Sequence, residues 1–303
     1  MNEISRYIVI GDVHGCLNEL QKLIQKCKIR PNDCLVYVGD VLDKGPQGPQ
    51  TVRWIYEQAQ IYKTVVVMGN HELKNLLRFQ SFTEKISKDS TVKLPSNVYT
   101  NNYFALRDVD KNFLTQSLLY FKIPKTQFIV IHAGVTPKCT LPKSSKITNI
   151  RRVDQTLLRV RFVRVDDEVE LTTKIKTVLS GSHSKIKETI SQTKILKKYE
   201  MISLGEEWEK HQYWAQMYDG RFGHILFGHS SWKEDSSSKL FPHASGLDLG
   251  CVYGGKLCAA IVTPNAIDQN NADISYVTVD ALKTYTLKYK ATLIDDKGYY
   301  RDQ

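Results

Sequence analysis

Three apolar runs of the sequence each end in a glycine that is followed at once by an acidic or amide residue. These endings are Gly-Asp-Val-His at 11–14, Gly-Asp-Val-Leu-Asp-Lys at 39–44 and Gly-Asn-His at 69–71. Two later apolar runs end in histidine, at His132 and His229. Carboxylate, imidazole and amide groups together suit borderline divalent ions such as Mn²⁺, Fe²⁺ or Zn²⁺. The endings therefore predict a metal site, and the last two histidines supply what a second ion would need.

The pattern around these endings indicates which elements position them. Val-, Ile- and Tyr-rich runs are typical of strands, and they lie at 7–10, 34–38 and 64–68. A helical pattern follows each run, and helices are expected over 17–27, over about 49–60 and after residue 71. Alternating strands and helices favour a mixed or parallel sheet, whose strands gather ligands at one edge. One Gly-Asp ending alone is more often turn chemistry, but several at one edge point to a site.

The second half of the chain is predicted to be rich in strands. They are expected at 128–131, 224–227, 246–249, 256–262 and 276–279. Between them, the sequence suggests a short hairpin of 159–165 and 169–173 around an acidic turn at 166–168.

Charge favours a polyanionic partner. The 303 residues include 42 Lys and Arg against 32 Asp and Glu, a net charge of +10, which attracts nucleic acid, nucleotides or polyphosphate. Much of the excess lies in 138–164, which holds eight basic residues and the single acid Asp154. A solvated basic face is the alternative interpretation of that window.

The composition excludes several classes of protein. An apolar fraction of 42% with 24% charged residues is that of a folded globular chain and not of a disordered one. No run reaches the roughly 18 apolar residues of a membrane span, so no membrane partner is expected. The six cysteines form no Cys-x-x-Cys pair and no signal-peptide pattern precedes the first strand, so we expect reduced thiols and a cytoplasmic location.

The ordered motifs resemble those of the calcineurin-like metallophosphoesterases, and among them the phosphoprotein phosphatase superfamily. The pattern GDxHG, GDxxDRG, GNHE, HAG and a late histidine runs from Asp12 to His229, with Lys44 where the protein phosphatases carry arginine. The HAGVTP run at 132–137 and the segment PHASGLDLGCVYGG at 242–255 are similar to the diadenosine tetraphosphatase-like (ApaH-like) branch.

The resemblance implies a site with two divalent ions. Asp12, His14 and Asp40 would hold the first ion, and Asp40 would bridge to a second ion held by Asn70, His132 and His229. Two such ions share a hydroxide nucleophile and clamp phosphate oxygens. Mn²⁺ is the expected metal, with Fe²⁺, Zn²⁺ and Co²⁺ as the other candidates.

Further residues receive roles from the same resemblance. His71 would protonate the leaving oxygen, with Asp43 orienting its imidazole and stabilising its charged form. Lys44, Asn70 and one of Arg151 or Arg152 would bind the phosphate. His243 and Tyr253 could line the substrate, although a solvent-facing histidine and a core tyrosine explain them as well.

Because the implied ligands come from both halves of the chain, we expect one α/β domain over 1–303. The resemblance implies a four-layer α/β/β/α metallophosphoesterase sandwich, with a basic insertion at about 137–219. The expected function is metal-dependent hydrolysis of phosphoanhydrides or phosphate esters in a polyanionic substrate, namely a dinucleoside polyphosphate, an mRNA cap or polyphosphate.

Two other functions stay open at this stage. One is a serine/threonine phosphoprotein phosphatase, and the other is a non-catalytic protein that binds nucleic acid or phosphate. RNA is therefore a candidate partner, and the oligomeric state is left open.

Overall fold

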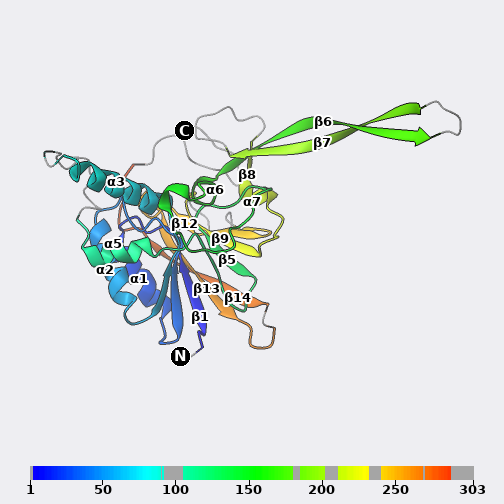
Figure 1. Ribbon diagram of the computed structural model, residues 1–303. Helices are drawn as coiled ribbons and strands as arrows, with labels where there is room; N and C mark the ends of the chain where they lie inside the picture. Colours follow the sequence, from blue (N-terminus) through cyan, green and yellow to red (C-terminus); the bar gives the residue numbers. More distant parts are fainter. Residues whose placement is uncertain are drawn as a thin grey trace.

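A computed structural model describes residues 3–89, 91, 105–179, 185–201, 211–231, 240–268 and 270–287. Its body contains two β-sheets, and helices flank them (Figure 1). A long two-stranded arm projects from this body (Figure 1).

The first sheet contains the strands that lead into the predicted site. Its strand order is β12-β13-β1-β2-β3, with β14 paired to β13. Strands β1, β2 and β3 are parallel, whereas β13 runs antiparallel to β1. The bounds are Arg6–Ile10 (β1), Asp33–Tyr37 (β2), Lys63–Val66 (β3), Asp248–Leu249 (β12), Lys256–Pro264 (β13) and Ala272–Asp280 (β14). The parallel pairing confirms that the three Gly-Asp and Gly-Asn endings meet at one edge.

The second sheet has the order β10-β11-β9-β5-β4. Strands β5, β9 and β11 are parallel, and this brings the endings at His132 and His229 next to each other. The bounds are Tyr120–Lys122 (β4), Phe128–Ile131 (β5), His224–Phe227 (β9), Leu240–Phe241 (β10) and Ala244–Gly246 (β11).

The central strands are apolar on both faces because each face is covered. In β1, Tyr7 and Val9 join a cluster with Phe128 and Val130 of β5, between the two sheets. The alternate residues of β1 belong to the cluster that includes the helices. The strands therefore form the middle layers of a sandwich, as expected from the sequence.

Helices cover the first sheet more fully than the second. Their bounds are Leu17–Cys27 (α1), Gly48–Gln58 (α2), Asn70–Ile86 (α3) and Asp108–Thr115 (α5). Helix α1 packs on β13 and β14 and ends at Lys28, which has a left-handed backbone with φ of 49°. On the second sheet the single turns Thr156–Arg159 (α6) and Trp214–Met217 (α7) contribute to a thin outer layer, in which the Trp214 ring lies 4.9 Å from that of Phe227.

The short hairpin expected at 159–173 is wrong. The structure has long strands at Phe162–Leu179 (β6) and Lys185–Met201 (β7), in a separate sheet of order β7-β6-β8 that includes His211–Tyr213 (β8). The expected acidic turn lies inside β6, where Asp166 is paired with Lys198 and Asp167 with Lys197. The pairing of β6 with β7 therefore continues through the three positions where the turn was expected.

The strand expected at 246–249 is divided between the two sheets. Gly246 ends β11 in the second sheet, and Asp248 begins β12 in the first, so the chain crosses from one sheet to the other at Leu247. Over the described ranges, the helices are all too short or too polar to cross a membrane.

Candidate metal centre

Asp12 and His14 lie in the loop that follows β1. The carboxylate of Asp12 accepts hydrogen bonds from the backbone N–H of His229 at 3.1 and 3.2 Å. The ring of His14 approaches the carbonyl oxygen of Leu42 through Nδ1 at 2.9 Å, so Nδ1–H donates and Nε2 keeps its lone pair. That nitrogen lies 3.9 Å from Asp12 Oδ2 and 3.6 Å from Asp40 Oδ2.

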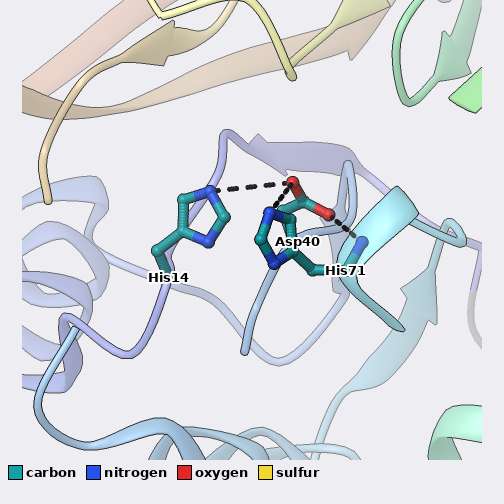
Figure 2. A group of neighbouring side chains, drawn as sticks. All are labelled: His14, Asp40 and His71. Carbon is teal, nitrogen blue, oxygen red and sulfur yellow. Dashed lines mark hydrogen bonds and ion pairs between the residues drawn. The ribbon is translucent and has the colours of Figure 1, made fainter. Parts of the chain in front are cut away.

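Asp40 stands at the centre of the group. One of its oxygens accepts the backbone N–H of His71 at 2.9 Å, and Figure 2 shows that its carboxylate contacts both His14 and His71. The backbone of Asp40 is left-handed, with φ of 50°, and His14 and His229 share this conformation at 46° and 64°. Left-handed backbone is costly outside glycine and is concentrated at functional sites. The loops therefore contain unfavourable backbone conformations at the three residues whose side chains meet in the site.

His132, His229 and Asn70 complete the other side. His132 lies with Nδ1 at 2.9 Å from the carbonyl oxygen of Val38, and its Nε2 is 3.1 Å from Asn70 Oδ1 and 3.5 Å from Asp40 Oδ1. The rings of His132 and His229 are 5.2 Å apart. Hydrogen bonds from one ring nitrogen to a carbonyl oxygen orient metal-binding histidines in this way.

Two groups of side chains could each hold a metal ion, and Asp40 belongs to both. In each group the candidate ligand atoms lie within 4.8 Å of one another, and the groups are His14, Asp40 and His71, and Asp40, His132 and His229. The donors are the oxygen and nitrogen atoms that borderline divalent ions prefer. The residues therefore fit a pair of divalent ions, and Asp40 has the central position that a bridging ligand needs.

Burial and charge act in opposite directions on Asp40 and His132. Burial alone would raise the pKa of Asp40, but the charges of His132, His71 and His14 outweigh it and hold that pKa well below its usual range. Burial likewise opposes the charged form of His132, yet Asp40 and Asp12 raise the pKa of this ring to about 9. The cluster thus holds positive charge beside a buried carboxylate.

His71 is held by Asp43, as expected for a proton donor. Its Nδ1 lies 2.7 Å from Asp43 Oδ2, and the same oxygen accepts from Asn75 Nδ2 at 3.0 Å. Its Nε2 turns toward the site, 4.0 Å from Asp40 Oδ2. Asp43 is fully buried, so the orientation of the His71 ring is fixed from behind.

Lys44 reaches the same place. Its Nζ lies 2.8 Å from His14 Nε2 and 5.3 Å from the centre of the Tyr253 ring. The lone pair of His14 therefore already faces a cation. Burial, reinforced by the charge of Lys44, lowers the pKa of His14 well below its ordinary value. Tyr253, an open candidate from the sequence, borders the site through Lys44.

The structure does not bring Arg151 to the site. Arg151 lies in the short helical turn η1 (Ile150–Arg152) and pairs with Glu84 at 2.6 Å. Glu84 is fourteen residues beyond Asn70 on α3, which is about 20 Å along a helix axis. Arg152, the next residue of this turn, is exposed. His243 is exposed too, and its ring contacts Tyr218 at 6.4 Å.

Glu72 is a site residue that the sequence reasoning did not single out. Its two oxygens accept four backbone N–H groups: Asp40 at 2.7 Å, Gly69 at 3.2 Å, Val41 at 3.0 Å and Leu42 at 3.2 Å. Burial and then the charge of Asp40 raise its pKa to about 7. Glu72 therefore ties the Asp40 loop to the start of α3. The sequence feature that could have identified Glu72 is its place directly after His71 in the GNHE motif.

Two further arginines border the site and were also missed. The carbonyl oxygen of Arg159 lies 3.2 Å from His229 Nε2, and Arg161 donates from Nη2 to the carbonyl oxygen of His229 at 3.0 Å. The sequence placed both within the basic insertion, and the contacts depend on how that segment folds back over β9.

Known proteins are similar to this chain in sequence. The sequence profile of the calcineurin-like phosphoesterases matches residues 5–232. A symmetrical bis(5'-nucleosyl)-tetraphosphatase of Pseudomonas putida F1 is 27% identical over 265 residues, covering 82% of this chain and 86% of the relative. The enzyme of the same name from Pseudomonas syringae pv. syringae B728a is 26% identical over 299 residues, covering 91% and 95%.

Solved structures share the fold. A crystal structure described as a candidate diadenosine tetraphosphatase has a TM-score of 0.57 and 22% identity, and the match covers 92% of this chain and 95% of that one. A protein serine/threonine phosphatase from Saccharomyces cerevisiae has a TM-score of 0.52 and 15% identity, covering 93% and 82%. The sandwich fold expected from the motifs is thereby confirmed.

Proposed function

The chain belongs to the calcineurin-like phosphoesterases, which hydrolyse phosphate esters and anhydrides, and from this premise we propose that it cleaves phosphoanhydride bonds in a polyanionic substrate. A dinucleoside tetraphosphate is the first candidate, and an mRNA cap and inorganic polyphosphate are the others. The observation that carries the proposal is the position of Asp40, which belongs both to the group with His14 and His71 and to the group with His132 and His229, while Asp43 holds the His71 ring.

The proposed ligands are Asp12, His14 and Asp40 for one ion and Asp40, Asn70, His132 and His229 for the other. Two divalent ions at this position, Mn²⁺ by our proposal, would stabilise charge on the phosphate oxygens and lower the pKa of water. Lys44 adds a cation to the site. Burial disfavours its charged form, but the interactions with Tyr253 and Asp40 outweigh burial and raise the pKa of Lys44.

His71 is proposed to supply the proton. A water molecule attacks phosphorus and releases one proton to solvent, and the bridging P–O bond breaks. Nε2 of His71 gives its proton to the departing oxygen and regains one from solvent. Asp43 holds Nδ1 at 2.7 Å, so Nε2 points toward the candidate metal centre, where the departing oxygen would lie. Asp43 is thus a positioning residue, because it contacts His71 and not the reacting atoms.

Substrate preference rests on charge and on the relatives. The two Pseudomonas relatives are named for action on bis(5'-nucleosyl) tetraphosphates, and a chain of phosphates is more highly charged than a phosphoserine. The excess of basic residues in 138–164 favours such a chain. We also propose that 1–303 acts as one domain with a basic insertion at about 137–219, in the cytoplasm, where its six free thiols would remain reduced.

One panel of substrates tests the proposal. The purified chain is assayed after addition of Mn²⁺ with equal concentrations of dinucleoside tetraphosphate, capped RNA, polyphosphate and phosphopeptide, and again after chelation of the metal. Faster turnover of the phosphate chains, lost on chelation, supports the proposal. Preference for the phosphopeptide would contradict it in favour of a phosphoprotein phosphatase. Binding without turnover of any substrate would indicate a non-catalytic protein.

A further inference from the structure

Helix α3 carries positive charge on the same face as His71. Residues three, four and seven positions apart share one face of a helix. His71 and Asn75 occupy this face and both contact Asp43. Lys74 and Arg78 follow His71 by three and seven residues. The helix that supplies the proposed proton donor therefore also presents two cations that lead away from it.

A third cation comes from a distant segment. The carbonyl oxygen of Arg159 lies beside His229 Nε2 at 3.2 Å, so this residue borders the candidate metal centre. Its side chain is exposed, and Nε donates to Gln155 at 2.8 Å. The backbone of Arg159 therefore borders the candidate metal centre, and its charge is near enough to act on Lys74 of α3.

These cations are close enough to oppose one another. Burial lowers the pKa of Lys74, and the charges of Arg78, Arg159 and Lys44 lower it further, whereas Asp43 acts in the other direction. Asp43 already accepts hydrogen bonds from His71 and Asn75. Repulsion between the partly buried Lys74 and the charges of the exposed Arg78 and Arg159 costs free energy, and an anion bound between them would relieve it.

We propose that Lys74, Arg78 and Arg159 form a subsite for the phosphate groups that flank the scissile one in a polyphosphate chain. The inference rests on the proposed function, and it specifies the ligand as a linear chain of at least two linked phosphates, with or without nucleosides at its ends. Lys74 and Arg78 are about 6 Å apart along the helix axis, which spaces charge along such a chain. A monoester has no second phosphate to reach them.

The test compares substrates of different length. Lys74→Met and Arg78→Met keep most of the aliphatic stem and remove the charge, so packing changes little. Lys85→Met is the matched control, because Lys85 is exposed in the last turn of the same helix. The readout is kcat/KM for a dinucleoside tetraphosphate divided by that for a chromogenic monoester. The double variant is expected to lower this ratio at least about tenfold, since the lost contacts are made by the longer substrate alone.

A binding measurement adds a readout independent of turnover. The probe for calorimetry is a tripolyphosphate analogue in which methylene groups replace the bridging oxygens. Its Kd should be at least about tenfold higher for the double variant and for Arg159→Met than for the wild type. The Lys85→Met control should bind like the wild type. An unchanged Kd, or equal loss of activity on both substrates, would overturn the subsite.

The two proposals fail in different ways. A wild-type chain that cleaves the monoester and no phosphate chain refutes the proposed function, while a raised Kd of the double variant for the analogue would still support the subsite. A wild-type chain that cleaves the tetraphosphate, with an unchanged substrate ratio in the double variant, supports the function and refutes the subsite.

Discussion

At the scale of single residues, Asp40 has the most demanding position. It is 2% exposed, carries a left-handed backbone and contacts candidate ligands on both sides. A carboxylate that serves two ions cannot be replaced by an amide without weakening both sites. Asp40→Asn should therefore bind fewer than two ions per chain and lose at least about 10²-fold in kcat/KM.

Metal analysis of the dialysed protein and steady-state kinetics check this prediction. Asp108→Asn is a suitable control, since its side chain is 93% exposed. Full activity of Asp40→Asn with two bound ions would contradict the bridging role.

His71 should behave differently from Asp40, because its proposed role is to donate a proton and not to bind metal. His71→Asn should keep both ions and lose turnover of substrates with poor leaving groups. A very acidic leaving group needs no proton, so the loss should shrink for such an ester. Comparing two phosphate esters of different leaving-group acidity measures this effect. Equal loss on both esters would remove the assignment.

The candidate ligands could be placed from the sequence because each comes soon after a strand. Asp12 and His14 follow β1 by two and four residues, and His132 follows β5 immediately, so the local pattern was enough to place them at strand ends of the two sheets. Glu72 was missed because its hydrogen bonds go to a loop about thirty residues earlier in the chain. Arg151 was expected near the phosphate because no local pattern revealed its pairing with Glu84.

At the scale of elements, Glu72 joins the start of α3 to the loop after β2. Each of its two oxygens accepts two backbone N–H groups. In Glu72→Gln an NH₂ group would face N–H donors and leave at least one of them unsatisfied, at a cost of about 2–4 kcal/mol. Denaturant unfolding should show this loss. Glu84→Gln, on the exposed end of the same helix, should change stability by less than about 0.5 kcal/mol. Equal stability of the two variants would contradict the role of Glu72.

His224 links two parallel strands, and its protonation on unfolding makes the stability of the fold depend on pH. Its Nε2 lies 2.8 Å from Ser245 Oγ, between β9 and β11. Burial, and then the charge of His243, lowers the pKa of His224 from 6.5 to about 4. Between these values the unfolded chain binds a proton that the folded chain does not, so stability falls as the pH drops from about 6.5 toward 4.

His224→Gln keeps a hydrogen-bonding side chain that does not titrate. Between about pH 7 and 4.5 the variant should lose about 2 kcal/mol less stability than the wild type. Denaturant unfolding of both proteins at the two pH values measures the difference. Parallel losses would show that His224 is not responsible for the acid sensitivity.

The elements were predictable where both faces of a strand are buried and less so elsewhere. The runs that became β1, β2, β5 and β9 are apolar because sheets and helices cover them. The arm of β6 and β7 is different, because its ladder runs through many positions that are charged in the sequence. Its acids resemble a turn when β6 is read alone, and only the register with β7 shows them to be part of a strand.

At the scale of the whole molecule, the site depends on contacts between residues far apart in the sequence. Asp12 accepts from the backbone of His229, 217 residues away, and His132 binds the carbonyl oxygen of Val38, 94 residues away. A glycine is needed at 228, because a Cβ there would clash with Asp12 Oδ1. The two halves of the described chain therefore both contribute to the candidate metal centre, which neither could form alone.

Net charge acts over the longest distance. The molecule carries +10, and exposed lysines such as Lys143 and Lys146 lie in the basic window but make no contact with the candidate ligands among the described residues. Such charges steer a polyanion toward the site and affect its association rate more than the chemical step.

The double variant Lys143→Gln and Lys146→Gln should therefore lower kcat/KM for a dinucleoside tetraphosphate about two- to fivefold at low salt. This deficit should vanish at about 0.5 M salt, where the Debye length is only a few ångströms. Hydrolysis of a small monoester should change little at either salt concentration. A deficit that persists at high salt would mean that these lysines bind the substrate directly, and a deficit that is equal for the monoester would mean that they support the fold of the site.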